Sequence, residues 1–393
     1  MIPAFVACCS KAGLAVTRAL GQRNVPVFGI CYGKGQIACH SRFMRGHFRC
    51  TDPSDDEEAF IDQLLQLAPG SERPVLIPSD DSSLVAVARR AEQLESRFRL
   101  CCAPWSIVRR MIEKHLTYEI ARTSGVPCPA LHLIDARESA LSAKVAEAVA
   151  FADRVGYPCL IKPSVGHLFF RKFRRKMLMV NSEAELREQL PLALTCSGPL
   201  MLCEFIPGDD SCGVNYNSFA IEGEVCAEFT AQKLHNKPEL IGFPTAVRSV
   251  VLPEVQALGR RMLRAIGLTD FSCMEFKRDP RDGIYKLMEV NARHNYSGAL
   301  ALACGINFPF MSYRRALDLI VQDEITPQRE NVLWIDEERD ATRIARALVH
   351  WREAGPTLDP LRLEKVFAVT RLDDPRPTWD LVKSSLQMGS GGE

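Results

Sequence analysis

Short apolar runs and amphipathic stretches alternate through the first hundred residues. Residues 2–9 (IPAFVACC) and 25–32 (VPVFGICY) have the pattern of buried strands, and residues 14–21 have helical spacing after a turn at 10–13. A strand, a glycine-bearing turn, a helix and a second strand form a βαβ unit, which implies a parallel sheet. Helices and strands continue to alternate at 54–68, 73–81, 82–98 and 99–104. We therefore predict one small open α/β domain over residues 1–104.

A predicted hairpin in the second half of the chain carries unusually polar side chains. Its strands are FSCMEFKR (271–278) and IYKLMEVNAR (284–293), joined by the turn DPRDG. Glu275 lies on the first strand. Glu289, Asn291 and Arg293 lie on the second, where alternation points all three in the same direction.

These four side chains are costly to bury without partners. Two carboxylates and an amide oxygen suit Mg²⁺, which takes hard oxygen ligands and shares them with phosphates. The neighbouring guanidinium suits an anionic phosphate or carboxylate oxygen. The alternative is a hairpin with an ordinary solvated face.

Two lysines and a basic loop precede this hairpin. Lys114 falls within a helix predicted from residue 105 to Gly125, and Lys162 ends the apolar strand GYPCLIKPS. The alternative for Lys114 is an ordinary surface lysine on a helix. The alternative for Lys162 is a side chain that extends from the end of the strand to solvent. The loop at 167–176 interleaves basic and aromatic residues, which suits a lid over a polyphosphate better than nucleic acid in an otherwise neutral chain.

A strand that breaks at a Pro-Gly pair follows the loop. MLCEFI stops at Pro207, so backbone amides at 204–206 are available to an adenine edge, and Asp209 or Asp210 to ribose hydroxyls. A helix at 251–267 then leads to the hairpin. Beyond it, the pattern is helical at 299–320 and more polar at 330–385, which predicts an appended unit or a wrap over the main domain, and the tail MGSGGE should be disordered.

Composition changes this description little. A length of 393 residues predicts two or three domains, and 47% hydrophobic with 25% charged residues is typical of a soluble globular protein. The 49 basic and 48 acidic residues balance, which argues against nucleic acid or membrane partners. The 15 cysteines are scattered without any CxxC, as expected for free thiols in a reducing cytosol. No signal peptide or transmembrane pattern occurs, so we expect a cytoplasmic protein.

Taken in order, these motifs resemble the ATP-grasp superfamily, most closely its branch of predicted carboxylate–amine ligases. The most specific part is MEF followed fourteen residues later by MEVNAR. The resemblance implies an α/β protein with α+β lobes: a Rossmann-like pre-ATP-grasp domain at 1–104 and an ATP-grasp domain at 105–320. It divides the latter into a small lobe at about 110–205 and a large lobe at about 206–320, with a C-terminal extension at 321–393.

The resemblance also implies roles for the hairpin. Glu275, Glu289 and Asn291 would hold one or two Mg²⁺, with Mn²⁺ as an alternative, and Arg293 would contact the reacting group.

Further residues match the nucleotide-binding parts of the pattern. Lys114 and Lys162 would contact phosphate, Lys176 would replace backbone amides of a glycine-rich loop, and Lys233 would be an extra contact to phosphate or to an intermediate. At the hinge, the implied contacts are Glu204, Phe205 and Ile206 to adenine and Asp210 to ribose.

The implied activity is ATP-dependent ligation of a small carboxylate to an amine through an acyl phosphate, releasing ADP and phosphate. Three alternatives stay open: a kinase or carboxylase acting on a small metabolite, a nucleotide-binding module without chemistry, and a binder of single-stranded nucleic acid. Homodimers are common in such ligases, so the resemblance allows one here.

Overall fold

The structure is a computed structural model in two compact units. It describes residues 1–33, 35–68, 72–134, 140–164, 169, 173, 175, 177–196, 198–240, 242–319, 326–341 and 363–389. Unit 1 comprises Met1–Val108, Asp209–Met274 and Asn291–Glu393, and unit 2 comprises Arg109–Gly208 and Glu275–Val290. The N-terminal domain and the C-terminal segment therefore belong to the same unit.

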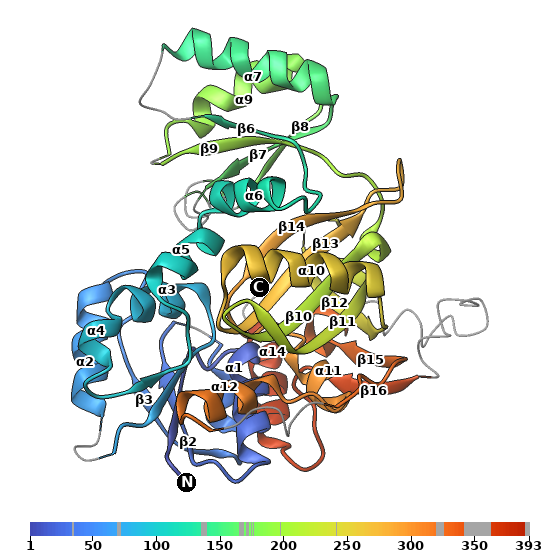
Figure 1. The fold of residues 1–393 in the computed structure, drawn as a ribbon. Helices are drawn as coiled ribbons and strands as arrows, with labels where there is room; N and C mark the ends of the chain where they lie inside the picture. Colours follow the sequence, from blue (N-terminus) through green and yellow to red (C-terminus); the bar gives the residue numbers. More distant parts are fainter. Residues whose placement is uncertain are drawn as a thin grey trace. The chain divides into compact units, whose positions relative to one another are not determined.

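A five-stranded parallel sheet organises the N-terminal part of unit 1 (Figure 1). Its order is β3-β2-β1-β4-β5, and every pair is parallel. The strands are β1 (Ala4–Ala7), β2 (Val27–Cys31), β3 (Met44–Arg49), β4 (Val75–Pro78) and β5 (Arg99–Leu100). The helical elements are α1 (Lys11–Gly21), η1 (Ile37–His40), α2 (Glu57–Leu67), α3 (Asp81–Arg89) and α4 (Ala91–Leu94). The predicted Rossmann-like α/β fold of this region is confirmed.

Several local predictions in this domain need correction. Gly13 lies inside α1 and not in a turn; a Cβ there would come within 2.2 Å of the Cys8 carbonyl oxygen, so glycine lets α1 pack onto the end of β1. The helix predicted at 82–98 is interrupted at Arg90. The edge strand β3 was not predicted, because its MRGHFR sequence is polar and half exposed instead of forming an apolar run.

Unit 2 contains an antiparallel sheet of order β6-β9-β7-β8, which two helices cover on one face (Figure 1). The strands are β6 (Leu131–Ile134), β7 (Cys159–Pro163), β8 (Leu178–Val180) and β9 (Leu200–Glu204). The covering helices α7 (Leu141–Val155) and α9 (Glu183–Ala193) contribute Ala148, Leu186 and Leu190 to a core shared with Ile161 and Leu202.

Two helices precede that sheet in the chain, where the sequence predicted one. They are α5 (Trp105–Ile112) and α6 (Lys114–Thr123), separated at Glu113. Lys114 is therefore the first residue of α6, not a mid-helix residue as predicted. Tyr118 of α6 packs with Leu160 and Met201 of the sheet.

The third sheet has seven strands in the order β14-β13-β10-β11-β12-β15-β16. Its strands are β10 (Gly213–Ile221), β11 (Glu224–Lys237), β12 (Phe243–Ser249), β13 (Asp270–Arg278), β14 (Tyr285–Asn291), β15 (Val332–Ile335) and β16 (Glu364–Phe367). The remaining elements are η2 (Asp210–Cys212), α10 (Pro253–Ile266), α11 (Gly298–Ala303), α12 (Phe308–Ala316) and α14 (Arg376–Gly389). The predicted hairpin is present as β13 and β14, but Arg293 lies two residues beyond β14, so its predicted strand position was wrong.

The C-terminal segment is built into unit 1. Strand β15 pairs with β12 and β16 pairs with β15, so both extend the seven-stranded sheet. Asp374 accepts hydrogen bonds from Arg18 Nε (2.8 Å), Ser41 Oγ (2.7 Å) and the Arg42 amide (2.8 Å). Residues 342–362 of the region 330–385, which was predicted as an appended unit or a wrap, lie outside the described residues. The tail prediction was wrong for residues 388 and 389, which belong to α14.

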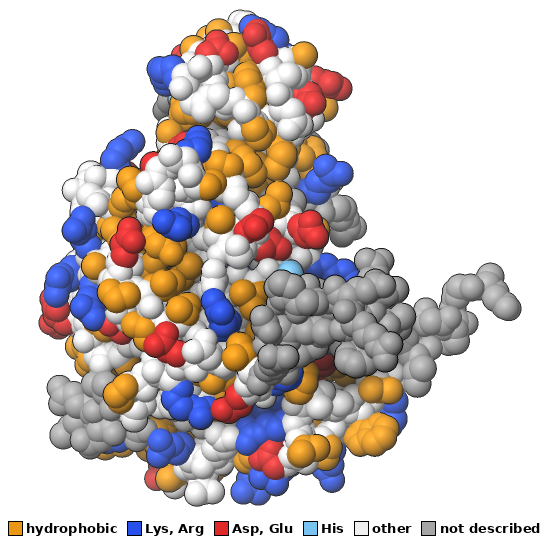
Figure 2. Space-filling model, turned by 90° about the vertical axis from the view of Figure 1, so that its right-hand side faces the viewer, with side chains coloured by type: hydrophobic (Ala, Val, Ile, Leu, Met, Phe, Trp, Pro, Cys, Tyr) orange, Lys and Arg blue, Asp and Glu red, His pale blue; other side chains and the backbone are white. Residues whose placement is uncertain are grey.

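The surface carries both signs of charge. Lys and Arg are interspersed with Asp and Glu on the face shown in Figure 2. In the part of the chain that the structure describes, no helix combines the length and the apolar character needed to cross a bilayer.

A buried ion pair fixes the start of β13. Asp270, with 4% of its surface exposed, accepts hydrogen bonds from Arg315 Nη2 at 2.7 Å and from the Phe271 amide at 2.7 Å. Arg315 also donates to the Leu100 carbonyl of β5 (2.8 Å). Burial opposes the ionisation of Asp270, but Arg315 and Ser312 hold its pKa below the ordinary value.

We expect Asp270→Asn to destabilise unit 1 by about 3 kcal/mol, because Arg315 would lose its carboxylate partner in a largely buried position. The control is Asp318→Asn. Asp270 (φ 99°) and Asp318 (φ 59°) both have positive φ, a backbone region in which asparagine is tolerated, so the same substitution can be compared at the two positions. Asp318→Asn removes the partner of Arg99 where the carboxylate side chain is 89% exposed, and should cost about 0.5 kcal/mol or less. Urea unfolding of the two variants measures both losses of stability. Equal unfolding midpoints would contradict a stabilising role for the Asp270–Arg315 ion pair.

Candidate functional site

One of the two predicted lysines of unit 2 pairs with a predicted carboxylate, and the other is buried. Lys114 Nζ is 2.7 Å from Glu289 Oε1. Lys162 is 7% exposed; burial lowers its pKa, the Cys203 thiol opposes this shift, Lys114 reinforces it and Glu289 opposes it. A cation that is desolvated and only partly compensated favours the arrival of an anion.

Local structure explains how these lysines meet. Lys162 lies on β7, whose five residues are all buried, and pairs with Met201 of β9. The end of β7 is joined to the start of α6, since the Lys114 amide donates to the Ser164 carbonyl (3.4 Å) and His115 Nδ1 lies 2.7 Å from Ser164 Oγ. The sequence predicted both lysines but not the break at Glu113 that brings Lys114 to the head of a helix.

The hinge segment 204–208 is held by the β13–β14 hairpin. Lys277 Nζ donates to the carbonyls of Ile206 and Gly208, both at 2.9 Å, and lies 5.4 Å from the centre of the Phe205 ring. Lys277 was not singled out from the sequence. The available signal was its position two residues after Glu275, which puts both side chains on the same face of β13.

Glu204 of the hinge is occupied by contacts within unit 2. Its carboxylate accepts hydrogen bonds from the Ala130 amide at 3.1 Å and from Arg281 Nη2, and lies 3.7 Å from Lys286 Nζ. Its backbone amide donates to the Ala130 carbonyl (2.9 Å). The carboxylate thus anchors the hinge, while Ile206 is 2% exposed.

The predicted oxygen donors lie on the two strands of the hairpin. Glu275 on β13 and Glu289 on β14 are half-buried, and Asn291, the last residue of β14, is buried with 9% of its surface exposed. Glu289 and Asn291 share one face of β14 because they are two residues apart. Two carboxylates and one amide oxygen form a set of hard donors that fits Mg²⁺.

In unit 1, Arg293 binds a carboxylate of the N-terminal domain. Its Nε and Nη2 donate to the two oxygens of Asp81 at 2.8 and 3.1 Å, and Nη2 lies 3.4 Å from Asn291 Oδ1. Asp81 begins α3, three residues after the end of β4. The loop between β4 and α3 lies at the carboxyl end of a parallel strand, where open α/β sheets place ligands.

Asp210 and Lys233 both lie in unit 1, on η2 and β11. The Asp210 carboxylate accepts hydrogen bonds from the Asn236 amide (2.7 Å), Asn236 Nδ2 (2.7 Å) and the Leu240 amide (2.8 Å). It therefore binds η2 to the end of β11. Lys233 lies on β11, is 8% exposed, and pairs with Val247 of β12.

The predicted lid is described only in part. Lys176 and most of the loop at 167–176 lie outside the described residues. Phe169 is 1% exposed and its ring centre lies 4.6 Å from that of Phe173, and both contribute to the core of unit 2. These two aromatic side chains are therefore directed into the protein core, which removes them from the base-stacking role considered for the loop.

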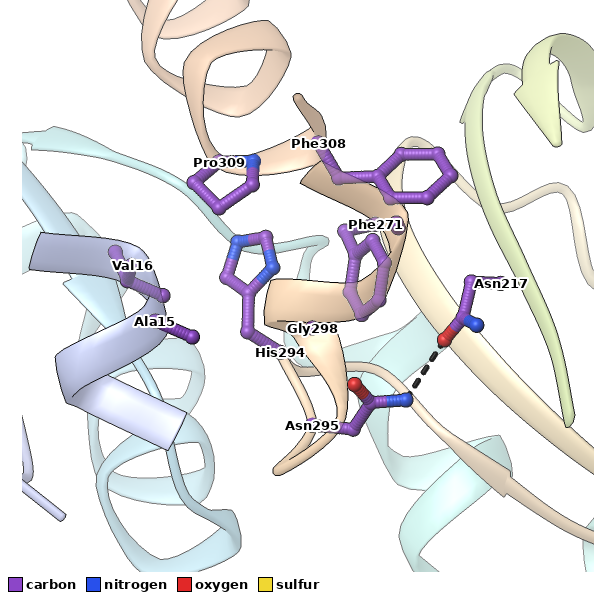
Figure 3. A pocket seen from close by; sticks show the side chains of 10 residues that line it. Ala15, Val16, Asn217, Phe271, His294, Asn295, Gly298, Phe308 and Pro309 are labelled. Atoms are coloured by element: carbon purple, nitrogen blue, oxygen red, sulfur yellow. Dashed lines mark hydrogen bonds between the residues drawn. The ribbon is translucent and has the colours of Figure 1, made fainter. Parts of the chain in front are cut away.

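The two residues that follow Arg293 in the chain help to line a small cavity (Figure 3). His294, Phe271, Asn295 and Asn217 are among its lining residues, and its volume of about 10 Å³ suits one water molecule. Asn295 Nδ2 donates to Asn217 Oδ1 (2.7 Å), and His294 stacks on Phe271 with 4.4 Å between ring centres. At this volume the cavity is a packing feature and not a substrate pocket.

Comparisons with known proteins agree on the fold. No family model matches the chain. The chain is 26% identical over 274 residues to a D-aspartate ligase of Enterococcus faecium; the match covers 64% of this chain and 62% of that protein, so the chain spans less than two thirds of its relative.

Solved structures match over a larger share of the chain. An L-amino acid ligase from Bacillus licheniformis has a TM-score of 0.62 at 18% identity, covering 85% of this chain and 78% of that one. The biotin carboxylase domain of Hydrogenobacter thermophilus 2-oxoglutarate carboxylase, solved with MgADP, ADP and bicarbonate, has a TM-score of 0.63 at 18% identity, covering 85% and 73%. The chain has the ATP-grasp fold that its motifs predicted.

His294 makes unit 1 sensitive to acid. Burial lowers its pKa to about 4, with Asp270 acting in the opposite direction. Unfolded chains, whose histidines titrate near about 6.5, then bind a proton between roughly pH 6.5 and 4 that the folded protein excludes, so stability falls as pH falls through this window.

We expect the melting temperature to drop from pH 7 to pH 5, and to drop less in His294→Gln. The two proteins are compared by the slope of melting temperature against pH. The melting temperature at a single pH would also reflect the loss of stacking on Phe271. Identical slopes for the two proteins would contradict a buried neutral histidine.

Proposed function

We propose that this ATP-grasp protein is an ATP-dependent carboxylate–amine ligase that forms an amide or peptide bond and releases ADP and phosphate. The observation that carries the proposal is the ion pair of Lys114 with Glu289, together with the buried Lys162, in a chain with this fold. Similarity to a D-aspartate ligase and to an L-amino acid ligase supports an acid substrate that is itself an amino acid or a similar small carboxylate.

Glu275, Glu289 and Asn291 are the proposed ligands of one or two Mg²⁺, with Mn²⁺ as an alternative occupant. Their oxygen donors fit a hard cation, and the solved relative with MgADP binds this metal with its nucleotide. When bound, the ion would neutralise charge on the phosphates of ATP.

The two lysines would bind the phosphates. Lys162 is desolvated, and a phosphate oxygen beside it would stabilise its charged form. Lys114 is held by Glu289 at 2.7 Å, which keeps its ammonium group extended in one position, and it would exchange part of that contact for phosphate. Lys176 is proposed as a further phosphate contact, and Asp210 as the ribose contact, which requires it to release one of its amide partners.

The hinge would receive the adenine. Glu204 and Lys277 immobilise the chain on both sides of Phe205, so the backbone at 204–206 is ordered before nucleotide arrives. Pre-ordering reduces the entropy lost on binding.

The chemistry would proceed in two steps. A carboxylate oxygen of the substrate attacks the γ-phosphorus, and the bond to ADP breaks, giving an acyl phosphate. An amine nitrogen then attacks the carbonyl carbon, phosphate departs with the C–O electron pair, and the nitrogen releases a proton to solvent.

Arg293 is proposed to hold the substrate carboxylate and then the anionic tetrahedral intermediate. Its bidentate contact with Asp81 supports this role, because the guanidinium already accommodates a carboxylate of that geometry. Lys233 is proposed as an additional contact to the intermediate. The cytoplasmic location and the homodimeric state stay predictions.

The decisive experiment measures ADP release from the purified protein against pairs of amino acids and amines with MgATP. A ligase releases ADP only when both an acid and an amine are present, and the mass of its product equals the sum of the acid and amine masses less one water. ADP release with an acid or bicarbonate alone would instead identify a kinase or carboxylase.

We expect Glu289→Ala to abolish ADP release, by a factor of about 10³ or more, while unfolding in urea at nearly the same midpoint as wild type. Removing the carboxylate deletes a proposed metal ligand and frees Lys114. Glu183→Ala, at an exposed helix position, is the control and should retain full activity. Turnover by Glu289→Ala comparable to wild type would refute the metal assignment.

Lys277→Met should raise the KM for ATP about tenfold and leave kcat within about twofold. The ammonium group stabilises the hinge carbonyls before and during reaction equally, so its loss removes uniform binding. Steady-state kinetics at varied ATP concentration measures KM and kcat separately. A lowered kcat with unchanged KM would exclude the hinge role, and Arg278→Met on the exposed end of β13 serves as the matched control.

A further inference from the structure

Three cysteines of the N-terminal domain come together although they are scattered in the sequence. The sulfur atoms of Cys9, Cys31 and Cys39 all lie within 4.8 Å of one another. Cys9 follows β1 by two residues, Cys31 is the last residue of β2, and Cys39 lies in η1. The cluster therefore forms at the carboxyl edge of two neighbouring parallel strands.

The backbone fixes this arrangement. The Cys9 amide donates to Gln36 Oε1 (2.9 Å), and the Ala38 amide donates to the Cys9 carbonyl (2.9 Å), so η1 is tied to the end of β1. Gly29 of β2 leaves room for the sulfur, because a Cβ at this position would lie 2.6 Å from Cys9 Sγ.

The cluster is shielded and chemically soft. Cys9 is fully buried and Cys31 is 6% exposed, within a core that includes Leu14 and Ile37, while Cys39 is half-buried and gives access from solvent. Among the described residues, the group of potential ligands contains thiols alone, with no carboxylate or imidazole. Sulfur donors without hard ligands select soft cations.

Coordination number narrows the choice of metal. Structural zinc sites in proteins are almost always four-coordinate, whereas this cluster provides three sulfurs. A trigonal ion with metal–sulfur bonds of about 2.3 Å holds its sulfurs about 4 Å apart, a small contraction from the spacing observed. Three thiolates, two of them from buried residues, suit trigonal coordination of a monovalent d¹⁰ ion.

We propose that Cys9, Cys31 and Cys39 form a three-thiolate site for one soft monovalent cation of the Cu(I) class. Binding replaces thiol S–H bonds by sulfur–metal bonds and releases the thiol protons to solvent, with no change in the oxidation state of sulfur or metal. The site is independent of the proposed ligase chemistry, since none of its residues has a role there.

The test is an anaerobic titration of the reduced full-length protein with Cu(I) in the presence of bathocuproine disulfonate, which removes weakly bound ion from the other cysteines. We expect one equivalent to be retained per chain by the wild type. Cys39→Ser should weaken retention at least 100-fold, and Gly29→Ala should weaken it by displacing the Cys9 sulfur.

Cys128→Ser is the matched control, since Cys128 is a half-buried thiol of unit 2 outside the cluster. It should retain one equivalent, and circular dichroism should show all variants folded. Zn²⁺ offered in place of Cu(I) should bind more weakly. Equal retention by Cys39→Ser and Cys128→Ser, or none by wild type, would overturn the proposal. ADP release by Cys39→Ser should match wild type, so failure of either proposal leaves the other intact.

Discussion

The buried contact between Asp270 and Arg315 determines where β13 begins. Asp270 has a φ of 99°, which an L-residue adopts only where its surroundings compensate, and its carboxylate bonds its own neighbour Phe271 as well as the arginine. Arg315 also reaches the Leu100 carbonyl of the N-terminal sheet. One ion pair thus joins α12, the first sheet and the first residue of the strand that carries Glu275 and Lys277.

Once β13 begins at Asp270, the alternation of side chains along the strands determines which face of the sheet each candidate residue occupies. Glu275 and Lys277 share a face of β13, and Lys277 uses it to hold the hinge carbonyls. On β14, Glu289 engages Lys114, which a break in the helical segment places at the head of α6. Lys114 and Lys277 are each held by a carboxylate or by carbonyl groups, whereas the charge of Lys162, which is 7% exposed, is opposed by burial.

Charges in unit 1 are arranged differently. Arg293 is already paired, because it donates hydrogen bonds to both carboxylate oxygens of Asp81. In the role proposed for Arg293, a substrate carboxylate would have to exchange with Asp81, which would make the N-terminal domain part of the recognition of the acid. Asp210 has three backbone or side-chain donors of its own, so the proposed contact to ribose would involve a similar exchange.

The sequence by itself determined the ATP-grasp fold, the parallel N-terminal sheet, the β13–β14 hairpin and the lysines at 114 and 162. Those features rest on periodicity and on turn residues, which act over a few neighbouring positions. It misplaced Arg293 on the strand and Gly13 in a turn, because element ends depend on what packs against them.

Only the tertiary structure could pair Arg293 with Asp81, 212 residues away, or Lys277 with the hinge carbonyls. The same holds for Cys9, Cys31 and Cys39, which no spacing rule unites. Their sulfurs meet because parallel strands bring their carboxyl ends to one edge and because Gly29 leaves space there, and both depend on sheet register and close packing rather than on local sequence.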